Sequence, residues 1–192
     1  MSALNSLFPV QLHTHWIPSS QLDVDSCLAD WLLDPTSLTA RLKKHSHDFR
    51  VVVLGQRLEK CSKQDACEII QVGSEILTRE VILYCDDSAQ VFARSLLPLA
   101  SLTGEEQALA TLGDKPLGQV IFSKANLTRT AIEVGRFNNQ SSVAKLADKL
   151  ELNASQEMWG RRSLFHVDDK PIVVAEVFLP NAFAYKKERE LL

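Results

Sequence analysis

The chain has 192 residues, of which 45% are hydrophobic and 23% charged, as is usual for a soluble domain with one sizeable core. Its 21 basic and 24 acidic residues give a formal net charge of -3, which excludes a global positive field for gathering nucleic acid or anionic lipid. No apolar run approaches the roughly 20 residues that a membrane helix needs. The N-terminal stretch lacks the features of a secretory signal, so we expect a cytoplasmic protein without membrane insertion.

Two short helices are predicted first. Capping residues around Leu22 to Ser26 precede an apolar stripe from Cys27 to Leu32, and Asp34-Pro35 ends this helix. A second helix fits Thr36 to Lys44. Four cysteines follow no zinc-binding spacing, and we expect free thiols at Cys27, Cys61, Cys67 and Cys85.

Strands dominate the rest of the chain. Hairpin turns are predicted at Asp86-Asp87-Ser88 and at Asp168-Asp169-Lys170. We predict strands at Phe49–Leu58, Ile76–Cys85, Val91–Leu97, Thr128–Phe137 and on both sides of the second turn, and helices at Ser101–Leu112 and around Val143–Leu150. About six strands joined by short turns indicate one α+β domain, an antiparallel sheet with helices covering one face.

Glu176 is out of place in the last strand. From Ile172 to Leu179 all residues except Glu176 are apolar, which is typical of a strand with neither face in water. Alternation puts Glu176 on the face of Ile172, Val174 and Phe178. An unpaired charge there would cost several kcal/mol, so the fold must supply partners.

Arg79 is the corresponding exception in the strand Ile76–Cys85, because it shares a face with Leu77 and Val81. One interpretation is a structural ion pair between Arg79 and Glu176, or an arginine that extends to the rim of the sheet. The other is a closed pocket, in which the guanidinium binds a carboxylate and the glutamate contacts a hydroxyl. Apolar walls between these ends would suit a six-membered ring.

Other candidate sites are weaker. The five histidines form no HExxH or equivalent ligand set, and no phosphate-binding glycine loop or nucleophile elbow is present. Trp159-Gly160-Arg161-Arg162 is basic and aromatic enough to contact nucleic acid. The acidic balance favours instead a strand arginine pair at a pocket mouth or on the surface.

Several blocks in order resemble the chorismate pyruvate-lyase family, whose members make 4-hydroxybenzoate at the start of ubiquinone biosynthesis. They are ADWLLDPTSLTARL (29–42), LTREVILYCDD (77–87), LGDKPLGQVIF (112–122), LTRTAIEVGR (127–136), WGRRSLF (159–165) and PIVVAEVFLP (171–180). The resemblance implies one chorismate lyase-like domain over residues 1–192 and a cofactor-independent carbon-oxygen lyase that retains its product. It favours the pocket interpretation over the ion pair.

The resemblance also implies roles for individual residues. Arg79 would grip the ring carboxylate of chorismate, and Glu176 would contact the 4-hydroxyl, either orienting it or also moving a proton. Leu38 and Leu117 would act at the carboxylate end through backbone groups, and Leu38 is often methionine in the family. Arg94 would belong to an outer anion site. We expect no metal, no nucleic-acid partner and a monomer.

The sequence leaves three questions open: the role of an insertion, the choice between enzyme and sensor, and the identity of the substrate. The chain between Arg136 and Trp159 is longer than the family pattern, and this insertion could cover the pocket or decorate the surface. The family is similar in fold to sensor domains of bacterial transcription regulators, so the chain could sense an aromatic acid without transforming it. A lyase acting on a chorismate relative with a shifted hydroxyl is the third possibility.

Overall fold

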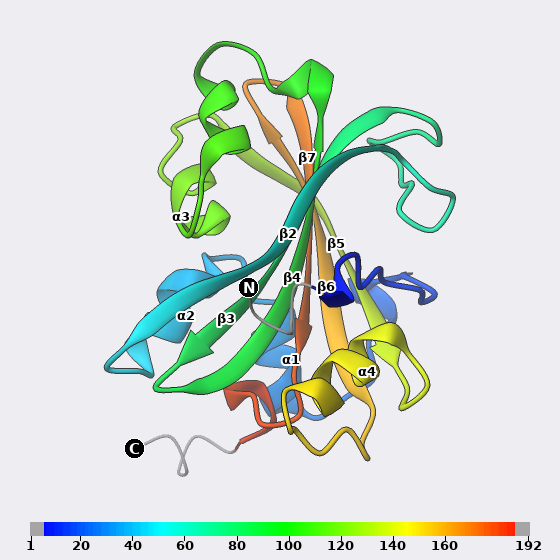
Figure 1. Ribbon diagram of the computed structural model, residues 1–192, viewed down its shortest axis with the longest axis vertical. Helices are drawn as coiled ribbons and strands as arrows, with labels where there is room; N and C mark the ends of the chain where they lie inside the picture. Colours follow the sequence, from blue (N-terminus) through cyan, green and yellow to red (C-terminus); the bar gives the residue numbers. More distant parts are fainter. Residues whose placement is uncertain (1–5, 187–192) are drawn as a thin grey trace.

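The computed structural model describes residues 6–186. Seven strands form one antiparallel sheet in the order β1-β5-β6-β7-β4-β3-β2, and the long strands twist through the middle of the molecule (Figure 1). The strands are β1 Ile17–Pro18, β2 Phe49–Lys60, β3 Glu75–Cys85, β4 Ser88–Pro98, β5 Leu127–Phe137, β6 Met158–Val167 and β7 Lys170–Phe178. The α-helices are α1 Ser26–Leu32, α2 Leu38–Lys44, α3 Leu117–Ile121 and α4 Ser142–Lys149, and short 3-10 turns cover Ser19–Gln21, Leu99–Ser101, Gly104–Thr111 and Phe183–Tyr185.

Local sequence explains most of these boundaries. The Asp25 carboxylate accepts from the Leu28 N–H at 3.0 Å and so caps α1, and Ser37 caps α2 in the same way. Each hairpin turn places two consecutive aspartates at positive φ, which is the conformation that a two-residue turn needs. The predicted antiparallel α+β fold and its two hairpins are therefore confirmed.

The two faces of the sheet carry different layers. On one face α1, α2 and α3 pack against Leu77, Val81 and neighbouring residues. The opposite face packs against α4 and the N-terminal segment, with Ile82 and Phe92 in that core. In Figure 1, α2 and α3 lie to the left of the sheet and α4 to the lower right. The insertion therefore packs on the sheet face opposite Arg79 and Glu176.

Three details differ from the expectation. Helices lie on both faces of the sheet and not on one, because α4 packs opposite α1, α2 and α3. The sheet has seven strands because a two-residue strand, β1, adds to β5 at its edge. The segment predicted as a helix at Ser101–Leu112 forms 3-10 turns, and Gly104 at φ 61° interrupts it. Cys61, Cys67 and Cys85 are free thiols. Within residues 6–186, no helix combines the length and the apolar character needed to cross a membrane.

Candidate active site

Arg79 lies at the centre of β3 with only 1% of its surface exposed. Its Nη2 donates to the carbonyl oxygens of Gly113 and Lys115, at 2.8 and 3.2 Å. Within the described chain no carboxylate forms an ion pair with Arg79. Burial lowers the pKa of the guanidinium, and the nearby charge of Asp114 offsets only part of this effect. A buried cation held only by carbonyls is available for an anion.

Glu176 projects from β7 on the same face of the sheet as Arg79. The strand register shows this, because Glu176 pairs with Ala93 and Ala93 pairs with Val81, two residues along from Arg79. Arg161 on β6 is the ion-pair partner of Glu176, and its Nε donates to Oε2 at 2.7 Å. The other carboxylate oxygen, Oε1, accepts no hydrogen bond from the described residues, so it can meet a ligand hydroxyl.

Small side chains form the floor between these charged groups. Ser95 lies opposite Arg79, Val174 opposite Ser95, and Ser163 opposite Val174. Two apolar clusters flank this floor on the same face. One contains Leu77, Leu97, Leu117, Phe165 and Ile172, and the other contains Trp31, Leu38, Val81, Val134 and Phe178.

The segments α2 and α3 lie against each other next to this floor. Leu38 opens α2 and Leu117 opens α3, and both side chains are at most 5% exposed. A Cβ on Gly118 would come within 3.3 Å of the Thr39 hydroxyl, so the first turns of the two helices touch. The structure thus brings Arg79, Glu176, Leu38 and Leu117 to one face of the sheet and buries all of them except Glu176, whose side chain is 14% exposed.

Buried polar atoms without partners collect on this face. Among residues 6–186, four buried side-chain N or O atoms lack a hydrogen-bond partner, and three of them belong to Arg79 (Nε), Arg129 (Nε) and Ser163 (Oγ). Such atoms are rare in folded proteins because each costs free energy, and a cluster of them indicates a ligand site. The fourth, Glu106 Oε1, lies 3.4 Å from Lys124 Nζ.

Arg94 lies on the opposite face of the sheet, away from Arg79. Its guanidinium is 2% exposed and forms ion pairs with Glu80, Asp65 and Glu59. A one-residue bulge near Tyr84 shifts the β3–β4 register, so that Arg94 pairs with Glu80. Without the bulge, Arg94 would face Arg79, and this is why alternation alone could not place it.

Sequence reasoning missed Arg161 as the partner of Glu176. A signal was available, because a two-residue turn at Asp168-Asp169 places residue 161 directly opposite residue 176. The neighbouring Arg162 faces the other side and pairs with Glu133 at 2.6 Å. The basic stretch from Trp159 is thus divided between two interior faces.

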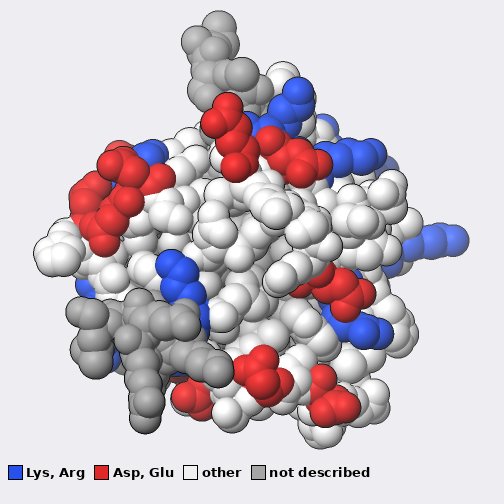
Figure 2. Space-filling view, turned by 90° about the horizontal axis from the view of Figure 1, so that it is seen from below, with Lys and Arg blue, Asp and Glu red and all other residues white. Residues whose placement is uncertain are grey.

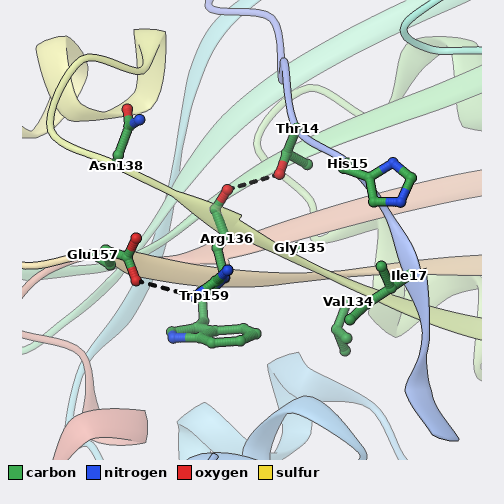
Figure 3. Close-up of a pocket in the computed structure, with 9 residues that line it drawn as sticks. All are labelled: Thr14, His15, Ile17, Val134, Gly135, Arg136, Asn138, Glu157 and Trp159. Atoms are coloured by element: carbon green, nitrogen blue, oxygen red, sulfur yellow. Dashed lines mark hydrogen bonds and ion pairs between the residues drawn. The ribbon is translucent and has the colours of Figure 1, made fainter. Parts of the chain in front are cut away.

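Three surface pockets lie elsewhere. The one in Figure 3 has a volume of about 340 Å³ and is lined by Thr14, His15, Ile17, Val134, Gly135, Arg136, Asn138, Glu157 and Trp159. A wider one of about 610 Å³ adjoins it along residues 136–145, and a small one lies beside Arg94. None of these three linings contains Arg79 or Glu176. Because Arg79 is buried, a ligand can reach its guanidinium only if the covering segments move.

Neither charge pattern nor ligand spacing favours another class of site. On the face shown in Figure 2, basic and acidic side chains are interspersed and form no continuous basic patch. Within residues 6–186, no group of three or more His, Cys, Asp or Glu residues has the geometry to hold a metal.

Comparisons with known proteins identify the family of this chain. A relative from Pseudoalteromonas translucida, described as a probable chorismate pyruvate-lyase, is 42% identical over 93% of this chain and 98% of its own. One from Psychromonas ingrahamii with the same description is 37% identical over 94% and 97%. The regulator PhnF from Mycobacterium smegmatis shares the fold alone, with a TM-score of 0.56, 16% identity, and coverage of 77% of this chain and 65% of PhnF. The family model described as chorismate lyase matches residues 11–190, and together with these relatives it shows that the chain belongs to the chorismate lyase family.

Proposed function

We propose that this protein is a cofactor-independent chorismate pyruvate-lyase, which converts chorismate to 4-hydroxybenzoate and pyruvate. The observation that carries the proposal is the position of Arg79 and Glu176. Both lie on one face of the sheet, on strands that are two apart and therefore about 10 Å from each other. Arg79 is held by a backbone carbonyl and Glu176 by Arg161, so the two residues do not form an ion pair with each other. The geometry leaves the small-residue floor between them for a ring.

In the proposed complex Arg79 binds the ring carboxylate. The guanidinium offers parallel donors, and its Nε, which has no partner among the described residues, gains one. Backbone groups at Leu38 and Leu117 lie at this end of the ring, where the two helices begin. The apolar clusters exclude water and strengthen the contact.

Glu176 contacts the 4-hydroxyl through Oε1, while the hydrogen bond from Arg161 to Oε2 orients the carboxylate. The reaction is then an elimination. C4 loses its proton, the electron pair of that C–H bond becomes a ring double bond, and the C3–O bond breaks. The enolpyruvate that leaves takes up one proton on its methylene carbon to become pyruvate, so no net proton is gained or lost. Binding the ring so that these bonds align lowers the barrier through orientation.

Product release requires movement, because the site is enclosed by α2, α3 and the turn whose carbonyls contact Arg79. We therefore propose that opening of these segments limits turnover and that 4-hydroxybenzoate stays bound after pyruvate has left.

The test is to mix the purified protein with chorismate and to measure pyruvate by a coupled assay and 4-hydroxybenzoate by its absorbance. Equimolar formation of both is expected. Tight binding of 4-hydroxybenzoate without any pyruvate would contradict the lyase and support a sensor with the same fold.

A further inference from the structure

Arg129 is a second interior arginine without a carboxylate partner. Of the other arginines that point into the sheet layers, Arg94, Arg161 and Arg162 each pair with at least one carboxylate within the described chain. Arg129 instead donates from Nη1 to the backbone carbonyl of Asp34 at 3.0 Å. Its Nε is buried and has no partner among residues 6–186.

Arg129 lies on the same face as Arg79, at the other side of the floor. It pairs with Phe165 in the β5–β6 register, and its guanidinium lies 4.8 Å from the centre of the Phe165 ring. Ser163, two residues from Phe165 on this face, is 1% exposed, and its hydroxyl also lacks a partner within the described chain. Arg129 and Ser163 are therefore diagonal neighbours with donors that point to no described residue.

The charges on this face match a ligand with two negative groups. Glu176 neutralises Arg161, which leaves Arg79 and Arg129 as two cations without a carboxylate in an ion pair. Burial and the nearby charge of Arg161 lower the pKa of Arg129 to about 10, so an anion beside it would relieve unfavourable electrostatics. Chorismate has two carboxylates, whereas 4-hydroxybenzoate has one.

We propose that Arg129, together with Ser163, forms a subsite for the carboxylate of the enolpyruvyl group of chorismate. This proposal rests on the proposed function and deepens it. Arg79 fixes the ring and Arg129 fixes the side chain that leaves, so the C3–O bond lies between two anchored ends. The product lacks the second carboxylate, so Arg129 contributes to substrate binding and specificity but not to product retention.

The subsite is tested with Arg129→Gln, which removes the charge and keeps an amide that can donate to the Asp34 carbonyl. We expect KM for chorismate to rise by about 10- to 100-fold, the loss expected for a charge-assisted contact. The dissociation constant for 4-hydroxybenzoate, measured by calorimetry, should stay within about twofold of wild type. Arg136→Gln is the matched control, because it makes the same change on the same strand at an exposed position and should alter neither quantity.

A second ligand makes the result independent of turnover. The probe is 3-(1-carboxyethoxy)-4-hydroxybenzoate, which carries a carboxylate beside the hydroxyl and cannot eliminate pyruvate. Arg129→Gln should weaken its binding by about 10- to 100-fold, and Arg129→Lys should restore part of it. Equal losses for the probe and for 4-hydroxybenzoate, or no loss for either, would overturn the subsite. A wild-type protein that forms no pyruvate would overturn the proposed function itself, so the two failures are distinguishable.

Discussion

Arg79 and Arg94 are buried arginines on neighbouring strands, and the structure predicts opposite consequences for replacing each with methionine. Arg94 holds three carboxylates, and Glu80 is 0% exposed. Removing Arg94 leaves buried anions uncompensated, which typically costs about 3–5 kcal/mol of the free energy of unfolding. Arg79 has only the carbonyls of Gly113 and Lys115 as hydrogen-bond partners within the described residues.

For Arg79→Met two contributions oppose each other. Two hydrogen bonds are lost, each worth about 1–2 kcal/mol, but a buried cation without a carboxylate partner is also removed, and its burial costs several kcal/mol. We expect the free energy of unfolding to change by less than about 2 kcal/mol. Affinity for 4-hydroxybenzoate should fall by about 2 kcal/mol or more, which is at least about 30-fold, because the ring carboxylate loses its charged donor.

Urea unfolding followed by circular dichroism gives the stability of both variants, and calorimetry gives the affinity for 4-hydroxybenzoate. The expected pattern is a stable Arg79→Met that does not retain product, and a destabilised Arg94→Met whose folded fraction still binds. If Arg79→Met were as unstable as Arg94→Met while affinity for 4-hydroxybenzoate was unchanged, Arg79 would be a structural residue and would not bind the ring carboxylate.

Three further predictions concern the groups around the ring. Glu176→Gln should keep the shape of the site, because Arg161 can still donate to the amide oxygen. It should lower kcat by at least about 10-fold. Full activity in the pyruvate assay would show that the charge of Glu176 is not needed. Burial raises the pKa of Asp34, but hydrogen bonds from Thr36 and Arg41 outweigh burial and hold this pKa below its ordinary value of 3.8. Ionised Asp34 therefore stabilises the fold above pH 3.8, and this contribution to stability is lost as the pH falls through the folded-state pKa. Asp34→Asn should thus show a smaller loss of stability than wild type between about pH 5 and pH 3 in urea titrations, and identical acid limbs would contradict this. Gly118→Val should separate α2 from α3, because even a Cβ at this position meets the Thr39 hydroxyl at 3.3 Å. Product release, measured in a pre-steady-state burst experiment, should become faster. Slower release would mean that this contact does not close the site.

Alternation within strands was enough to place Arg79 and Glu176 on interior faces. Each interrupts an apolar strand, and the two-residue periodicity of a strand leaves little choice of direction. Placing both on the same face required the order of the strands, which β4 provides by pairing with β3 on one side and β7 on the other. The residue pattern does not encode that order, and the structure supplied it.

The remaining site residues depended on details that alternation does not encode. The partner of Glu176 could be found from the length of the β6–β7 turn. The face of Arg94 could not be found in this way, because a single extra residue in the β3–β4 pair reverses it. The β5–β6 register also shifts between Arg129 and Ala131. In addition, Arg129 donates a hydrogen bond to the carbonyl of Asp34, which is far away in the sequence. The position of the insertion also needed the structure, because the apolar stripe of α4 could have packed on either face.

A crystal structure of the protein with 4-hydroxybenzoate bound would show directly whether Arg79 and Glu176 hold the two ends of the ring. We expect the carboxylate within hydrogen-bond distance of the Arg79 guanidinium, the ring over Ser95 and Val174, and the hydroxyl on Glu176 Oε1. A product molecule bound in one of the surface pockets, with Arg79 still bonded only to the carbonyls of Gly113 and Lys115, would contradict it.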